Sequence, residues 1–189
     1  MKKRTTTSQS GIPMSYLMLL IGAFSVGAVA GSLWASADGT TTLLLTSRLL
    51  GGGGTPAIRM ICFDLILLAL VFAAAFVRKG APMCALAFFL KGLLLSLTVT
   101  ACVGVLGAPG WGAAFALAFG SGFLSVSALL LLSLQALQPV GKRLNRGKSH
   151  PDNVYYLTTL LCAAILGISE LVYWYLAPPL ARAAVALFT

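Results

Sequence analysis

Long apolar runs constrain the fold of this chain more than any other feature. The stretch "ALAFFLKGLLLSLTVTACVGVLG", from Ala85 to Gly107, contains a single charged residue, Lys91. A helix that crosses a bilayer needs about 20 predominantly apolar residues, and several runs reach or approach that length. Charged residues make up only 9% of the sequence, whereas a soluble domain carries roughly 25%. The sequence therefore predicts one all-α domain, residues 1–189, folded as a polytopic transmembrane helix bundle.

Five segments are expected to span the membrane. Their approximate boundaries are 13–36, 58–78, 83–107, 110–137 and 154–177. Segment 41–50 is too short to cross and is expected to lie at the interface, with a re-entrant helix as the alternative. The glycine run after it lacks the Gly-Lys-Ser/Thr ending of a phosphate-binding loop and is interpreted as a hinge or linker. The tail 178–189 begins with two prolines, and we expect it to turn away from the last span and remain on the outer side.

Basic residues are distributed unequally between the two ends of these spans. Alternating the spans places nine of them on one side, namely Lys2, Lys3, Arg4, Arg78, Lys79, Lys142, Arg143, Arg146 and Lys148. The other side receives three, namely Arg48, Arg59 and Arg182. Because cytoplasmic loops are enriched in Lys and Arg, we expect a multi-pass protein of the cell membrane with a cytoplasmic N-terminus and an outer C-terminus. This distribution also explains the net charge of +9 without a nucleic-acid partner.

Aromatic residues predict the same orientation. Trp and Tyr side chains concentrate where a membrane protein meets the lipid headgroups. At the outer interface we expect Trp34, Trp111, Tyr173, Trp174 and Tyr175, and at the inner one Tyr16, Tyr155 and Tyr156.

The N-terminus allows a second interpretation. The sequence "MKKR", an apolar run and then "ASA" at 35–37 together imitate a cleavable signal peptide. The run from Ile12 to Trp34 exceeds the 7–15 residues of a signal-peptide core, which favours an uncleaved first helix. Cleavage would remove one span and leave the orientation of the others unchanged.

Neither a metal site nor a cofactor is expected. The four cysteines, Cys62, Cys84, Cys102 and Cys162, all lie in apolar runs, and the one histidine, His150, lies in a polar loop. Zinc sites need ligands at characteristic short spacings, which these residues lack. We interpret the thiols as small, buried hydrophobic side chains.

Small residues recur at every fourth position of the first span. They are Ala23, Gly27, Gly31 and Ala35. This spacing places them on one helix face, and small side chains allow another backbone to approach closely in a membrane. We expect this face to pack inside the bundle, with homodimerisation as the alternative.

Three charged residues fall well inside the predicted spans, several residues from either end: Asp64, Lys91 and Glu170. A charge near the centre of a membrane helix costs about 2.5–3.5 kcal/mol, and pairing reduces that cost. We expect Lys91 to face the bundle interior and pair with Asp64, with Glu170 as a second candidate partner. Arg59 could neutralise Glu170 from the outer side. The alternatives are that Lys91 extends to the interface, or that the charges bind or transport a ligand.

Catalysis is not expected. Hydrolases and transferases that work in membranes need a nucleophile, a base or metal ligands in recognisable motifs. The sequence contains neither HExxH nor GxSxG. Serines and threonines within the spans are expected to bond back to their own helices. We therefore interpret the protein as a non-enzyme.

The third span resembles the stage II sporulation protein M family. The segment "FFLKGLLLSLTVTACV" carries that family's Lys-Gly pair at Lys91 and Gly92, followed by small residues and Thr98-Val99. The linker "RKGAPMCALAFFLKG" and the glycine-rich opening helix "LLIGAFSVGAVAGSLWA" are similar as well. The resemblance covers most of residues 15–140.

This resemblance implies a scaffold, with no chemistry of its own, that acts when a spore-forming bacterium engulfs its forespore. Its partners would be the lipid bilayer and other membrane proteins, including the peptidoglycan-degrading sporulation proteins D and P at the septal membrane. The alternative function is a substrate-binding or permease subunit of a small transporter of the energy-coupling-factor or ABC type. An even number of spans and an outward polar pocket would distinguish that transporter subunit from a scaffold.

Overall fold

The computed structural model describes residues 14–39, 55–77, 80–117, 122–137 and 153–188. These residues form six helices, and the all-α prediction is confirmed. The helices are α1 (Met14–Ala37), α3 (Thr55–Ala74), α4 (Ala81–Leu106), α5 (Ala108–Leu117), α6 (Phe123–Leu137) and α8 (Asn153–Phe188). The expected interfacial segment 41–50 and the basic loop before α8 lie outside the described residues.

Three of the described helices are long and apolar enough to cross a membrane. They are α1, α4 and the part of α8 from Asn153 to Leu171. At 1.5 Å per residue, the 26 residues of α4 extend for about 39 Å, more than the hydrocarbon core of about 30 Å. By length and composition the chain is a multi-pass helical membrane protein. Shorter apolar stretches occupy Cys62–Ala74 of α3 and the whole of α6.

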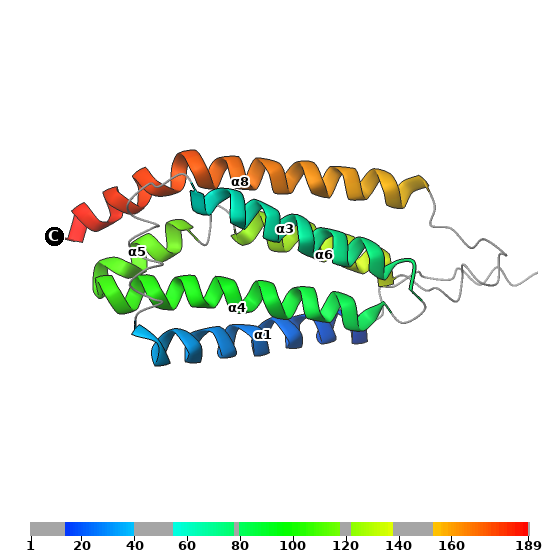
Figure 1. The fold of residues 1–189 in the computed structure, drawn as a ribbon, viewed down its shortest axis with the longest axis horizontal. Coiled ribbons are helices and arrows are strands. Elements are labelled where there is room, and N and C mark those ends of the chain that lie inside the picture. The colour runs from blue at the N-terminus through cyan, green and yellow to red at the C-terminus, as the bar shows by residue number, and fades with distance from the viewer. Residues whose placement is uncertain (1–13, 40–54, 78–79, 118–121, 138–152, 189) are drawn as a thin grey trace, which may run out of the picture.

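The long helices lie side by side, and their directions alternate along the chain. Figure 1 shows α1, α4 and α8 running in one direction and α3 and α6 in the other, while α5 lies at the end of the bundle near the C-terminus. α1 packs mainly on α4, whereas α3, α6 and α8 pack on one another. The core lies among α3, α4, α6 and α8, where Leu67, Val71, Leu129 and Leu132 are almost fully buried.

α6 is the helix whose buried face is most regular. Its buried residues recur at intervals of three and four: Ser125, Ala128, Leu129, Leu132, Ser133, Ala136 and Leu137. This spacing defines one stripe along an α-helix. Four of the seven are Ser or Ala, so neighbouring helices can approach α6 closely.

The segment expected as a continuous fourth span, 110–137, is divided between α5 and α6 in the structure. α5 has 10 residues and reaches only about 15 Å. The residues between the two helices, 118–121, lie outside the described ones. The stretch Gly120-Ser121-Gly122 has low helix propensity, which favours a division at this place.

The expected turn at Pro178-Pro179 is wrong. α8 continues through both prolines to Phe188, with a bend toward its C-terminal end (Figure 1). A proline inside a helix removes one N–H donor and crowds the carbonyl of the preceding turn. Membrane helices tolerate this as a bend because other groups can satisfy the freed carbonyls. The segment expected as an outer tail, 178–189, is therefore part of the last helix as far as Phe188.

Candidate functional site

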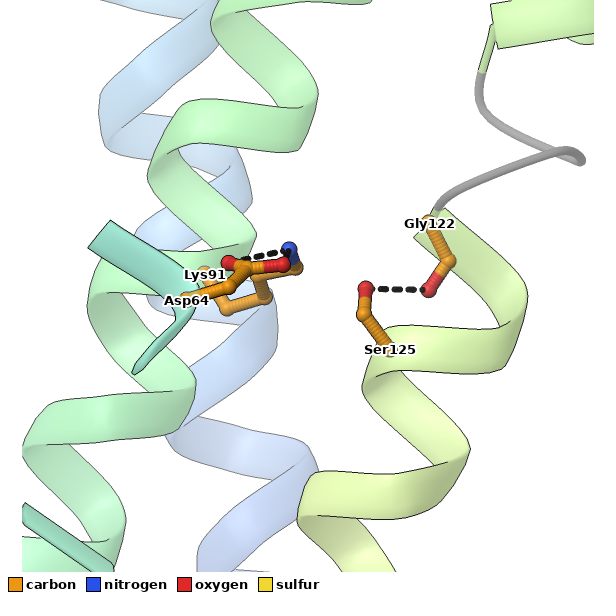
Figure 2. A network of polar contacts seen from close by, with 4 residues as sticks. All are labelled: Asp64, Lys91, Gly122 and Ser125. Carbon is orange, nitrogen blue, oxygen red and sulfur yellow. Dashed lines mark hydrogen bonds and ion pairs between the residues drawn. The ribbon is translucent and has the colours of Figure 1, made fainter. Parts of the chain in front are cut away.

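The predicted pairing of Lys91 with Asp64 is present in the structure. Lys91 Nζ lies 2.7 Å from Asp64 Oδ1 and 2.7 Å from Oδ2, so one ammonium group contacts both carboxylate oxygens (Figure 2). The side chains are 13% and 6% exposed. A pair withdrawn from solvent to this degree is screened little by salt. Removing one partner would leave the other charge buried and unpaired.

The antiparallel arrangement of α3 and α4 brings the two charges to the same level. Asp64 stands near the middle of the 20-residue α3, and Lys91 about 15 Å from the start of α4. Direct hydrogen bonds join the two charged groups at this level.

Glu170 joins this pair from α8. The residue is only 7% exposed, and its carboxyl group lies within reach of the charges of Asp64 and Lys91. Its neighbour Ser169 is fully buried. Three helices, α3, α4 and α8, thus each contribute one ionisable group to a single cluster, which we call the charge cluster (Asp64, Lys91 and Glu170). The side chain of Arg59, the other expected member, lies outside the described residues.

α6 adds a neutral polar group beside the charge cluster. Ser125 is fully buried, and its hydroxyl donates a hydrogen bond of 3.1 Å to the carbonyl of Gly122 in the preceding turn. Figure 2 shows this side chain pointing from α6 toward Lys91 and Asp64. The bond back to its own helix matches the expectation for a membrane serine.

The small residues of α1 pack against α4. Gly27, Gly31 and Ala35 are buried and Ala23 is partly buried. Gly27 lies against the backbone of Phe89 and Gly31 against that of Leu93. From the first contact to the second, the residue numbers increase by four on both helices, so α1 and α4 run parallel. The face is occupied inside one molecule, as expected, which leaves none of these glycines for a homodimer.

Gly92 completes this interface from α4. A Cβ atom placed on it would lie 3.2 Å from the carbonyl carbon of Phe24 and 3.3 Å from the amide nitrogen of Ala28, with the oxygen of Phe24 nearer still. Sequence reasoning noticed Gly92 only as half of the Lys-Gly pair and missed its contact with α1. Its position beside Lys91 could have indicated this contact. Successive side chains on a helix project about 100° apart, so the residue next to one that faces α3 points toward a different neighbour. The two residues therefore join α4 to two different neighbours.

The expected outer aromatic residues are exposed where the structure describes them. Trp34 is 56% exposed, Trp111 65% and Tyr175 72%. The side chains of Tyr173 and Trp174 lie outside the described residues. The end of α1, the whole of α5 and the end of α8, which carry these residues, share one end of the bundle (Figure 1).

Tyr155, which is predicted at the inner interface, is buried between helices. It is 2% exposed, its ring stacks on Phe72, and its hydroxyl donates hydrogen bonds to the carbonyls of Phe72 and Val71 at 3.2 and 3.4 Å. Carbonyls in the last turn of a helix lack partners within that helix. Tyr155 supplies a donor to the end of α3 and is therefore buried. Tyr16 is partly buried and Tyr156 is exposed.

The cysteines are all free thiols. Cys84, Cys102 and Cys162 are buried, as expected, but Cys62 is exposed. Cys162 lies 3.4 Å from the carbonyl of Ala128, which its thiol contacts as a weak donor. Within the described ranges, no group of three or more His, Cys, Asp and Glu residues is placed to hold a metal ion.

A groove of about 320 Å³ lies beside the bundle where α1, α4, α5 and α6 meet. Its wall includes Phe24, Leu95, Phe115 and Phe123. The surface is almost entirely apolar, and two of these rings, Phe115 and Phe123, are more than half exposed. The groove has no charged side chain and is separate from the charge cluster.

Comparison with known proteins gives no relative for this chain. No protein-family model matches it, and neither a curated protein nor a solved structure does. The class of protein follows from the chain's own features, namely apolar helices of membrane-spanning length that pack around a buried charge cluster.

Proposed function

We propose that this protein is a non-catalytic scaffold of the cell membrane, a helix platform that holds partner proteins. The observation that carries this proposal is how its polar residues are used. Lys91 and Asp64 join α4 to α3, and Tyr155 joins α8 to α3. The hydroxyls of Thr98, Ser125 and Thr159 bond to their own helices. None of these described groups is arranged as a nucleophile beside a base.

The proposed topology has five spans, with the N-terminus in the cytoplasm and the C-terminus outside. Alternating helix directions support it, because α1, α3, α4, α6 and α8 reverse in turn (Figure 1). So does the excess of Lys and Arg on one side of the expected spans. A tag at the N-terminus should be accessible only from the cytoplasm, and one at the C-terminus only from outside. Tags accessible from the same side would refute five spans.

Two parts of the chain are proposed as partner contacts, residues 38–57 and the segment after Pro178. Ala183 and Ala186 in the last turns of α8 are exposed and small, so they can admit a neighbouring helix closely. The resemblance around Lys91 and Gly92 supplies the partners to test first, the peptidoglycan-degrading sporulation proteins D and P.

Affinity purification of the tagged full chain from sporulating cells tests the scaffold function. Co-purification of cell-wall hydrolases is the expected result. The variant with Ala183→Trp and Ala186→Trp should lose them, because two large side chains occupy the proposed contact. Val29→Trp is the matched control, since Val29 is 59% exposed on α1, away from that contact. Recovery of an ATPase module instead of hydrolases would refute the scaffold.

One observation favours the alternative of a transporter subunit. The charge cluster lies near the middle of α3 and α4, and ionisable residues at such a depth often mark ligand or ion pathways. Two observations favour the scaffold instead. The helices α1, α3, α4, α6 and α8 alternate in direction, which favours an odd number of spans. The groove described above offers a ligand no polar contacts beyond one serine.

A further inference from the structure

The apolar groove between α1 and α6 follows from how these two helices pack. Both lie beside α4, yet α1 packs mainly on α4 and only slightly on α6. α6 begins at Phe123 and has only 15 residues, so it does not accompany the 26-residue α4 over its full length. A Cβ atom on Gly122 would lie 2.6 Å from a terminal methyl group of Leu95. α4 and α6 therefore meet inside the groove, while the exposed rings of Phe115 and Phe123 mark its open side.

The groove lies at the depth of lipid hydrocarbon. Phe24 stands about 15 Å along α1, which is about 36 Å long, and Leu95 about 21 Å along α4, which is about 39 Å long. Both residues are near the middle of helices that can cross a membrane. α5, which supplies Phe115, lies at one end of the bundle (Figure 1). The groove therefore extends from the middle of the bilayer toward the leaflet at that end.

The wall provides nothing that holds water or a polar ligand. None of the described residues that line the groove is charged, and among them Ser127 alone has a polar side chain. Its hydroxyl donates a hydrogen bond of 2.8 Å to the carbonyl of Phe123 in its own helix. A buried water needs about two to four polar partners, which this wall does not offer. The occupant that fits is apolar.

The dimensions of the groove favour a single hydrocarbon chain over a helix. One turn of an α-helix about 10 Å across occupies roughly 420 Å³, more than the 320 Å³ of the groove. Helices in membranes also meet through small residues, whereas three of the lining residues are Phe24, Phe115 and Phe123. An apolar cavity of about 150 Å³ takes one benzene molecule, so this groove takes on the order of a dozen carbon atoms.

We propose that the groove binds one acyl chain of a membrane phospholipid, which fills the space between α1 and α6. The proposal is independent of which partners the scaffold binds. Because lipid is already apolar, binding gains nothing from leaving water and depends on how closely the chain packs against the aromatic rings. The lining residues offer a headgroup neither a charge nor a free hydrogen-bond donor. The groove therefore recognises the acyl chain and not the headgroup.

Photolabelling of the full chain in lipid nanodiscs tests this site. The probe is a phosphatidylcholine with a diazirine near the methyl end of one acyl chain, and mass spectrometry locates the labelled residues. Leu95 and Val126 line the groove and are only partly exposed, whereas Leu160 of α8 is 69% exposed. Leu95 and Val126 should nevertheless be labelled more strongly than Leu160, because a bound chain stays beside them. A phosphatidylglycerol probe with the same acyl chain should give the same pattern.

Val126→Trp should lose the labelling of Leu95, because the larger side chain occupies the groove. Leu131→Trp is the matched control, since Leu131 lies on the same helix, is 53% exposed and does not line the groove. Its labelling pattern should equal that of the wild type. Phe115→Ala removes part of the wall at a position that is 68% exposed, so it should weaken the labelling without disturbing the core. Circular dichroism of each variant checks that it is folded.

Three outcomes would overturn the proposal. The first is labelling that follows exposure, with Leu160 labelled more strongly than Leu95 and Val126. The second is displacement of the probe by oleic acid but not by excess unlabelled phospholipid, which would identify a free fatty acid as the occupant. The third is a disulfide between two chains carrying Phe123→Cys that the wild type does not form, which would assign the groove to a second copy.

Discussion

Replacing Gly27 with alanine should separate α1 from α4. A Cβ atom at Gly27 would lie 2.8 Å from the carbonyl carbon of Phe89, whereas carbon atoms in contact lie about 3.5 Å apart. The helices must therefore move apart by roughly 0.7 Å or more. The neighbouring contacts at Gly31 and Gly92 belong to the same interface and would loosen with it. Overpacking of this kind costs about 1–3 kcal/mol.

Gly22→Ala is the matched control, because Gly22 lies on the same helix and a Cβ there meets nothing within 4 Å. Both substitutions gain the same helix propensity, about 1 kcal/mol, so their difference isolates the contact with α4. Unfolding by SDS in mixed micelles, followed by circular dichroism, measures that difference. Gly27→Ala should be less stable than Gly22→Ala by about 1–3 kcal/mol. Equal stability of the two variants would show that the α1–α4 contact is not as tight as described.

Three further changes can be measured by the same unfolding assay. Lys91→Met should destabilise the protein by about 3–5 kcal/mol because it leaves Asp64 buried and unpaired, and adding Asp64→Asn should recover part of this loss; no recovery would argue against the pairing as the cause. Tyr155→Phe should cost about 1 kcal/mol by removing the donor to Phe72, and a neutral result would place that hydroxyl in contact with water instead. Gly107→Ala should cost about 1–2 kcal/mol because Gly107 ends α4 with φ of 65°, so an alanine variant of unchanged stability would contradict that backbone conformation.

The sequence predicted the all-α fold and several contacts because apolar length and isolated charges are strong signals in a membrane. The run Ala85–Gly107 has too few polar residues to form a water-facing surface, so it predicts a membrane helix. The single charge of Lys91 within that run predicts an oppositely charged partner at the same depth. The packing face of α1 was predictable for a related reason. In a helix that is apolar all round, small residues at every fourth position are what distinguishes one face from another.

Other contacts could not be predicted because lipid-facing residues are as apolar as core residues. The alternation of polar and apolar faces that identifies a core in water is therefore missing. α4 is apolar on every side, so periodicity does not show that Cys84, Phe88 and Ala101 are buried. The burial of Tyr155 depends on carbonyls at the end of α3, more than 80 residues earlier in the chain. Pro178-Pro179 reads locally as a helix end, yet the helix continues because proline weakens a membrane helix without having to end it.

The Lys-Gly pair of α4 shows how physical demands alone can produce a family-like pattern. Lys91 binds Asp64 on α3 and Gly92 accommodates the backbone of α1. Any bundle that joins one helix to two neighbours, by an ion pair on one side and a close backbone contact on the other, gains from these residue types side by side. A local resemblance at this position is therefore compatible with the absence of a matching family model. Co-purified partners therefore test the proposed scaffold function more directly than the residues of this motif do.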